Sequence, residues 1–354
     1  MRLLNPGPVT LTPRVRDALA APDLCHRETE FFDLQDEVRA RLAAVYDLDW
    51  ASWAPIVLSG SGTAAVEAMM ASMPGEGARV LVIENGVYGE RMAKMADVHD
   101  IDHDTLSLAW GERIDPAALA ERLADERFTH VAVVHHETTT GRLNDLEAIA
   151  AVCAAGDVQL LVDAVSSFGA EAISFGSAVA AVAATANKCL HGAPGAAFVL
   201  TRRSALIHAK ARALYLDLAT YCEKQEARGT PFTPAVPAFH ALAAALAEHR
   251  EAGGWRARRT HYRALASRVA GGLARLGIEA VLDAEQSSCV LRAYQLPEGI
   301  SYDALHDHLK VAGFVIYAGQ GDLAEEIFRI STMGDLHSRD MDDLIARIAE
   351  ITAP

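Results

Sequence analysis

The stretch Leu160-Leu161-Val162-Asp163 runs apolar and then ends in a carboxylate. An unbroken apolar run of this kind is typical of a parallel strand that is buried on both faces of a sheet. Enzymes built on parallel sheets place polar ligand contacts at the carboxyl ends of such strands. Asp163 is therefore a candidate functional residue, although taken alone it is better explained as a cap of the following turn or helix.

Similar apolar runs recur along the chain, with amphipathic segments between them. The predicted strands are Ala54–Leu58, Arg79–Glu84, His130–His135, Gln159–Asp163, Ala180–Ala184 and Ala196–Thr201. The helical segments between them include Pro116–Ala124 and Leu146–Gly156. Strands that alternate with helices predict an α/β fold with a large, mostly parallel sheet.

The pattern changes after Thr233-Pro234. One or two long helices are expected between Val236 and Gly277, with an interruption at Gly253-Gly254. The expected elements after them are a helix at Tyr302–Ala312 and strands at Glu279–Leu282, Ser288–Tyr294, Phe314–Tyr317 and Ile327–Ser331. We therefore expect a large domain over residues 16–235 and a small α+β domain made of residues 1–15 and 236–354.

The charge balance and the cysteines limit the class of protein. The 354 residues include 32 Lys and Arg against 47 Asp and Glu, a formal net charge of −15, which disfavours nucleic acid and anionic membranes as partners. No run approaches the ~20 apolar residues of a membrane span, and the N-terminus lacks a signal-peptide pattern. Five scattered cysteines without a C-x-x-C pair favour reduced thiols in a cytoplasmic protein and disfavour a metal site.

A second candidate stretch is Ser59-Gly60-Ser61-Gly62-Thr63, which follows a predicted strand and precedes a helix. The N-terminus of a helix offers unpaired N–H groups and the positive end of a dipole, and both favour a phosphate. The Ser61 and Thr63 hydroxyls could complete a phosphate cup. A Gly/Ser turn with Thr63 as the helix cap is an equally good interpretation.

The third candidate is Lys188, in the nearly uncharged stretch Ala186-Asn187-Lys188-Cys189. Desolvation would lower the pKa of this amine and make it a competent nucleophile, although a single lysine more often snorkels from a strand end. A phosphate cup, a carboxylate at a strand end and a lysine, in this order, are what pyridoxal 5'-phosphate requires. The combination is more specific than any of its parts.

On these motifs the chain resembles the class V aminotransferases of pyridoxal-phosphate fold type I over nearly its whole length. The matching stretches are Asn5–Pro8, Ser59–Thr63, Asn85–Met92, His135–Gly141, Asp163–Gly169, Ala186–Cys189, Gly192–Gly195, Gly313–Tyr317 and Phe328–Ile330. The patterns H-x-E-T-T-T-G and D-A-x-S-S-F-G are most similar to those of the family branch that uses 2-aminoethylphosphonate. The resemblance implies a homodimer with a shared active site.

The resemblance also implies cofactor contacts. Lys188 would bind the cofactor aldehyde and move the proton, and Asp163 would keep the ring nitrogen protonated. The remaining expected cofactor contacts are Ser61, Gly62 and Thr63 at the phosphate, Thr233 from the other subunit, Tyr88 on the ring face, and Thr138 or Thr139 at the ring hydroxyl. Spacing alone does not choose between the two threonines.

Three further residues are expected to contact the substrates. Arg329, in a Phe-Arg-Ile strand, would bind the carboxylate of the keto acid, with a surface ion pair as the simpler alternative. His26 and Arg27 are hypothesised to help bind a phosphonate. Helix capping, with Arg27 paired to Glu30, explains that stretch equally well.

The expected reaction is amino transfer from 2-aminoethylphosphonate to pyruvate, giving phosphonoacetaldehyde and L-alanine. The alternatives are an alanine/serine–glyoxylate type of transaminase, a transaminase for a related aminophosphonate, and a lyase that uses the same cofactor and scaffold. A binding protein that only retains the fold is a further possibility. The intact Lys188 and Asp163 argue against that last alternative.

Other polar residues are assigned no role in catalysis. His135 and His136 are adjacent on a predicted strand, so they face opposite ways and cannot chelate one metal ion. His99 and His103 lack a helix that would bring them together. The arginines at positions 256, 258 and 259 are expected to form a solvated helix face.

Overall fold

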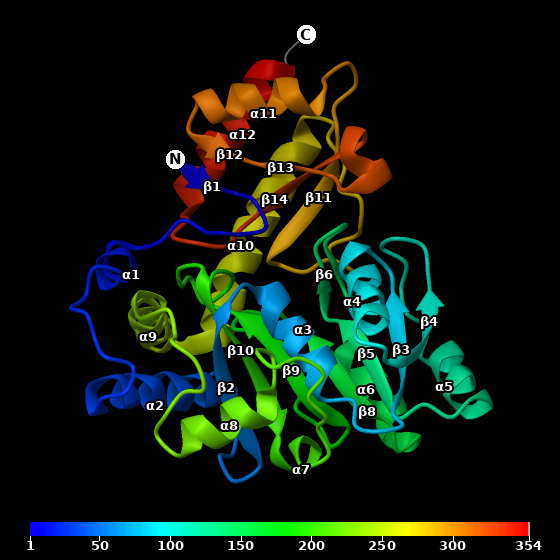
Figure 1. Cartoon of the computed structure of the whole chain (residues 1–354). Coiled ribbons are helices and arrows are strands. Elements are labelled where there is room, and N and C mark those ends of the chain that lie inside the picture. The colour runs from blue at the N-terminus through cyan, green and yellow to red at the C-terminus, as the bar shows by residue number, and fades with distance from the viewer. Residues whose placement is uncertain (353–354) are drawn as a thin grey trace.

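The computed structural model describes residues 1–352 and is built around a seven-stranded sheet (Figure 1). In spatial order the strands are β2 (Trp53–Gly60), β10 (Gly195–Arg202), β9 (Val179–Thr185), β8 (Gln159–Asp163), β5 (His130–Val134), β3 (Arg79–Glu84) and β4 (Asp102–Ser107). Only β10 runs antiparallel to its neighbours. The other six strands therefore end at the same edge, which gathers the segments that follow them.

Helices cover both faces of this sheet because its central strands are apolar on both sides. Leu160 and Val162 of β8 pack into one core, and Leu161 between them packs into the other. The helices around the sheet are α2 (Thr29–Ala44), α3 (Gly62–Ser72), α4 (Val87–Val98), α5 (Pro116–Asp125), α6 (Leu146–Ala155), α7 (Arg203–Leu206), α8 (Leu218–Glu226) and α9 (Val236–Glu251). Each fully buried Leu or Val side chain contributes roughly 1.5–3 kcal/mol to this packing.

Short polar residues fix where several helices start. The Asp115 carboxylate accepts a hydrogen bond of 2.9 Å from the N–H of Ala117, and Pro116 occupies the first turn of α5. Ser301 caps α11 (Tyr302–Val311) in the same way through the N–H of Ala304. Such caps stabilise a helix by about 1 kcal/mol each.

The C-terminal unit has its own core above the large sheet (Figure 1). Its strands are β11 (Leu291–Gln295), β12 (Phe314–Val315), β13 (Tyr317–Ala318) and β14 (Ile327–Ser331). Its helices are α10 (Gly254–Arg275), α11, the short 3₁₀ helix η1 (Gly321–Glu325) and α12 (Ser338–Thr352). The first strand of the chain, β1 (Arg2–Leu3), pairs with β12, so the N-terminus joins this unit. The short α1 (Pro13–Ala18) follows on the way to α2.

The expected domain limits remain a prediction. Phe239 and Leu242 of α9 pack in the core of the large sheet, whereas Leu265 and Leu273 of α10 pack in the C-terminal core. The long helical stretch is interrupted where it was expected, with Gly253 in a left-handed conformation (φ 96°) before α10.

The six predicted strands of the large sheet are confirmed, with ends that differ by at most two residues. The strand predicted at Glu279–Leu282 is wrong, because this segment makes only a single bridge, from Ala280 to Tyr294, before the chain turns away. Strand β4 was not predicted, since its sequence is polar and lies at the edge of the sheet. Within residues 1–352, no helix is long and apolar enough to cross a membrane.

Candidate active site

The predicted site segments meet at the carboxyl edge of the large sheet. Asp163 is the last residue of β8, and Lys188 follows the end of β9. Ser61 directly follows β2, and the segment from His135 follows β5. All four strands point the same way, so the topology itself brings these distant parts of the chain together.

The N-terminal segment of the chain covers the Lys188 side chain. The Lys188 Nζ donates a hydrogen bond to the carbonyl oxygen of Pro6. Gly7 has a φ of +122°, and a side chain there would place its Cβ 2.8 Å from Lys188 Cδ. Burial lowers the pKa of Lys188 to about 8, and the positive charges of Arg329 and Arg91 act in the same direction. The stretch around Gly7 carries the family resemblance, but no role was predicted for it.

Asp163 is a buried carboxyl group with one oxygen to spare. Its Oδ1 accepts a hydrogen bond of 2.9 Å from the N–H of Val165. Burial raises the pKa of Asp163 to about 6, while that hydrogen bond and the charges of Lys188 and Arg91 oppose the rise. Among residues 1–352 no Lys, Arg or His nitrogen lies within 4 Å of the carboxylate. The other carboxylate oxygen can therefore accept a hydrogen bond from a cationic N–H group of a ligand.

The Ser61–Thr63 turn is open for an anion. Ser61 occupies the cap position of α3, but its side chain makes no capping hydrogen bond. Thr63 is the second residue of the helix, so the interpretation of Thr63 as its cap is wrong. The first N–H groups of any α-helix have no partner within the helix. Those of Gly62 and Thr63 are thus available at the sheet edge, and Thr63 lines a small cavity together with Tyr88 and Asp163.

The structure distinguishes Thr138 from Thr139, which spacing in the sequence could not do. Thr139 donates its hydroxyl hydrogen to Glu137 Oε1 (2.6 Å) and accepts the N–H of Val87 (3.1 Å). The Thr138 hydroxyl makes no hydrogen bond within the described residues. Thr138 is therefore the threonine whose hydroxyl is free for a ligand.

Tyr88 stands in the first turn of α4, where the guanidinium of Arg91 lies 4.7 Å from the centre of its ring. This distance is in the range of a cation–π contact. Arg91 was part of the matching stretch, but no role was predicted for it. Its charge acts on both Asp163 and Lys188, so it belongs to the electrostatic surroundings of the site.

Arg329 enters the site from the C-terminal unit. It is 3% exposed, so the alternative of a surface ion pair is wrong. The guanidinium donates hydrogen bonds of 2.8 Å to the carbonyl oxygens of Ala318 and Thr138, and one of 3.2 Å to Gln320 Oε1. Burial lowers the pKa of Arg329, and the nearby Tyr88 and Glu137 partly offset this.

His26, Arg27 and Thr233 are not part of this cluster within one chain. Arg27 is exposed on the segment before α2, with its Nε 3.5 Å from His26 Nε2. The alternative pairing of Arg27 with Glu30 is not among the ion pairs of residues 1–352. Thr233 is exposed too, on a loop in which the N–H of Ala235 donates to Ser59 Oγ (2.7 Å).

The arginines near the start of α10 do more than solvate a helix face. Arg258 donates to the carbonyl oxygen of Cys189 (2.8 Å), directly after Lys188, and Arg259 pairs with buried Glu171 (3.0 Å). The expectation of a solvated face is therefore wrong for both residues. These two contacts could not be predicted from the sequence, because Cys189 and Glu171 lie far from the two arginines along the chain.

His135 and His136 have separate hydrogen-bond partners. His135 contacts Ser167 and His136 contacts Ser166, so the adjacent rings have separate partners, and burial lowers the pKa of each to about 4. Elsewhere, His99 bonds Glu67 at 3.0 Å. Over residues 1–352, no group of three or more His, Cys, Asp or Glu side chains could hold a metal ion.

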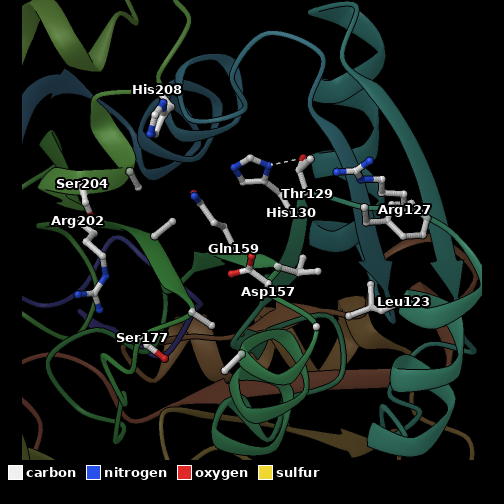
Figure 2. Close-up of a pocket in the computed structure, with 17 residues that line it drawn as sticks. Leu123, Arg127, Thr129, His130, Asp157, Gln159, Ser177, Arg202, Ser204 and His208 are labelled. Atoms are coloured by element: carbon white, nitrogen blue, oxygen red, sulfur yellow. Dashed lines mark hydrogen bonds between the residues drawn. The ribbon is translucent and has the colours of Figure 1, made fainter.

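A cavity of about 650 Å³ lies at the opposite edge of the sheet. Figure 2 shows His130 and Gln159, from the starts of β5 and β8, facing into it, and Arg202, from the end of β10, also lines it. The His130 Nδ1 is bonded to Thr129 Oγ1 (2.8 Å). None of the predicted site residues lines this cavity, so its size does not mark it as the place of the chemistry.

Comparisons with known proteins agree with the geometry. A family model described as aminotransferase class-V matches residues 16–320. The 2-aminoethylphosphonate–pyruvate transaminase of Lactiplantibacillus plantarum is 32% identical over 358 residues, covering 98% of this chain and 97% of that protein. A protein of the same name from Bacillus cereus is 33% identical over 361 residues, with the same coverage.

Two solved structures extend the comparison. An aspartate aminotransferase of subgroup IV from Thermus thermophilus has a TM-score of 0.91 at 29% identity, covering 99% of both chains. An alanine–glyoxylate aminotransferase from Nostoc sp. has a TM-score of 0.92 at 27% identity, covering 99% of this chain and 94% of the other.

Proposed function

The chain belongs to the class V aminotransferases, and on that basis we propose that it transfers the amino group of 2-aminoethylphosphonate to pyruvate. The products would be phosphonoacetaldehyde and L-alanine. The full-length relatives named 2-aminoethylphosphonate–pyruvate transaminase support this choice of substrates. The two proteins of similar structure are named for other substrates, aspartate in one case and alanine with glyoxylate in the other. The observation that carries the proposal is a partly buried amine, Lys188, on which the charges of a buried carboxylate, Asp163, and a buried guanidinium, Arg329, both act.

The residues of the site fit pyridoxal phosphate. The spare oxygen of Asp163 would hold the protonated ring nitrogen, and the turn at Ser61 would hold the phosphate. Tyr88 and Thr138 would contact the ring. The His136 Nε2 is buried without a hydrogen-bond partner in residues 1–352, so it is left to pair with a polar atom of a ligand. When bound, the cofactor would supply an electron sink for the substrate carbon that carries the nitrogen.

Lys188 would hold the cofactor aldehyde and then move the proton. Its amine has a lowered pKa, so a large share of it is neutral near pH 8 and can attack a carbonyl carbon. Once displaced by the substrate amine, the same Nζ can take the proton from the substrate carbon and deliver it to the former aldehyde carbon of the cofactor. The carbonyl of Pro6 is the group that holds Nζ in place.

Arg329 would bind the carboxylate of the keto acid and of alanine. A planar, charged guanidinium is a strong hydrogen-bond donor to such a group. Its Nε and Nη1 are already bonded to the protein, while Nη2 has no hydrogen-bond partner in the described part of the chain. The N–H groups of Nη2 would therefore meet the carboxylate, and the guanidinium would serve it without excluding the phosphonate from the same site.

We also propose a homodimer in the cytoplasm. The exposed Thr233 would complete the phosphate cup of the other subunit, and His26 and Arg27 would lie near the substrate phosphonate. Changing Arg27 to Ala should then weaken the binding of 2-aminoethylphosphonate far more than that of alanine. Equal losses for both donors would contradict this role of Arg27.

The test of the reaction is turnover of 2-aminoethylphosphonate with pyruvate, with glyoxylate and with no keto acid, measuring aldehyde, alanine, glycine and ammonia. The proposal predicts alanine and aldehyde in equal amounts with pyruvate. Preference for glyoxylate would favour the glyoxylate type, and release of ammonia without a keto acid would indicate a lyase. Lys188→Ala should abolish both the cofactor colour and the turnover.

A further inference from the structure

Glu137, on β6 (His136–Glu137), is an acidic side chain in the interior of an acidic protein. It is 0% exposed, and no ion pair joins it to a Lys, Arg or His within residues 1–352. Burial raises the pKa of this carboxyl group to about 7, against the effect of its hydrogen bonds. Burying such a group is costly, so its partners must offset the loss of water.

The partners of Glu137 come from two segments of the chain. Its Oε1 accepts the N–H (3.1 Å) and the hydroxyl (2.6 Å) of Thr139. Its Oε2 accepts the N–H groups of Tyr88 (3.2 Å) and Gly89 (3.3 Å) in the first turn of α4. The Thr139 hydroxyl in turn accepts the N–H of Val87. Glu137 and Thr139 together satisfy the first three amides of that helix.

Helix α4 cannot cap itself. Its cap position is Gly86, which has no side chain to offer. A side chain at position 86 would overlap the Glu137 side chain, so glycine makes room for a cap supplied from β6. The positive end of the helix dipole favours a carboxylate at this position.

The cap formed by Glu137 and Thr139 contacts or adjoins residues that are proposed to bind the cofactor and the substrate. Tyr88 is the second residue of α4, and Thr138 directly follows Glu137 in the chain. The carbonyl oxygen of Thr138 accepts a hydrogen bond from Arg329. A shift of Glu137 would therefore move Tyr88, Thr138 and the support of Arg329 at once.

We propose that Glu137 is a positioning residue of the active site, which sets Tyr88 and Thr138 in place for the cofactor ring by capping α4 from β6. The inference rests on the proposed function, because it assigns no contact of its own between Glu137 and a ligand. A helix cap with a purely structural role would stabilise the fold without affecting how a ring binds.

The test compares Glu137→Gln with Asp115→Ala, a control that removes the cap of α5 outside the site. For each apoprotein we would measure the thermal unfolding midpoint, the Kd for pyridoxal phosphate, and the visible circular dichroism of the bound cofactor. Glu137→Gln should raise the Kd by about tenfold and reduce the dichroism per bound cofactor, because amides are left without an acceptor. Asp115→Ala should lower only the unfolding midpoint.

Thr139→Val and Thr139→Ser test the same cap if Glu137→Gln fails to fold. Loss of the hydroxyl in Thr139→Val should raise the Kd and reduce the dichroism, and Thr139→Ser should restore both. A lower unfolding midpoint with unchanged Kd and dichroism would overturn the positioning role, as would equal behaviour of the two Thr139 variants. Failure of the wild-type apoprotein to bind the cofactor would instead overturn the proposed function, and this inference with it.

Discussion

The Nη1 atom of Arg329 lies 2.8 Å from the backbone carbonyl oxygen of Thr138. This contact joins β14 of the C-terminal unit to the segment that follows β6 at the edge of the large sheet. A second hydrogen bond, from Nε to the carbonyl oxygen of Ala318, holds the guanidinium within its own unit. The guanidinium that is proposed to bind the substrate carboxylate is therefore held by both parts of the chain.

Replacing Arg329 by lysine should specifically impair use of the keto acid. A lysine ammonium keeps the charge but loses the planar fork and both fixed contacts. We expect KM for pyruvate to rise by about 10- to 100-fold, since a lost hydrogen bond to a charged group costs about 1.5–3 kcal/mol. Steady-state kinetics with varied pyruvate measure this change.

The control for Arg329→Lys is Arg268→Lys, in an exposed ion pair with Asp342 of the same unit. That variant should leave KM for pyruvate unchanged. An unchanged KM in Arg329→Lys as well would mean that another group binds the carboxylate.

The lowered pKa of Lys188 predicts how cofactor binding depends on pH. Only the neutral amine attacks the aldehyde, and with a pKa of about 8 half of the amine is neutral at that pH and nearly all of it about one pH unit higher. An ordinary lysine would be only about 0.4% neutral at pH 8. The rate of reconstitution of the apoprotein should therefore level off above about pH 9.

Absorbance stopped-flow between pH 6 and 10 (about 0.5-unit steps) gives this profile. A rate that still rises in proportion to hydroxide up to the highest pH would show that the Lys188 amine keeps its ordinary pKa.

The central strands, and the three candidate motifs that follow them, could be recognised because both depend on local patterns. Apolar runs mark strands that are buried on both faces, and Asp163 and Lys188 stand at the ends of two such runs. Contacts between distant segments could not be predicted in this way. Nothing near Glu137 in the sequence indicates that it caps α4, and nothing near Arg258 indicates Cys189 as its partner. Strand β4 was not predicted, because an edge strand needs no apolar pattern.

Gly86→Ala should destabilise the protein by a steric effect alone. The added methyl group would overlap the Glu137 side chain, while the backbone at this position is extended and suits any residue. We expect a loss of about 1–3 kcal/mol, because the crowded cap must shift. Chemical denaturation of the apoprotein measures it.

Gly176→Ala is the matched control, since the nearest atom to a Cβ there is Ser174 Oγ, at a non-clashing 4.0 Å. It should have almost no effect on stability. If both alanine variants are equally stable, the space around Glu137 is not as tight as the structure indicates.

Glu171→Gln should weaken the connection between the two parts of the chain. The Glu171 carboxylate accepts hydrogen bonds from Ser288 Oγ (2.7 Å) and from the N–H of Cys289 (2.9 Å), and it pairs with Arg259. Although burial alone would raise the pKa of Glu171, the hydrogen bonds from Ser288 and Cys289 keep it below its usual value. Loss of the charge should cost about 2–4 kcal/mol, because buried donors lose their acceptor.

The control is Glu251→Gln, which removes the charge of an exposed ion pair with Arg14. Comparing the unfolding midpoints of the two variants distinguishes a buried contact from a surface contact. The surface variant should match the wild type. Equal midpoints for all three proteins would contradict a connecting role for Glu171.

The most direct test of the proposed activity is a single half-reaction of the cofactor-loaded protein. Lys188 and Arg329 should allow 2-aminoethylphosphonate and L-alanine, each added without keto acid, to convert the cofactor to its amine form, seen as loss of visible absorbance. O-phosphoserine should leave the spectrum unchanged. Conversion by alanine but not by 2-aminoethylphosphonate would contradict the proposed donor and leave His26 and Arg27 without the role proposed for them.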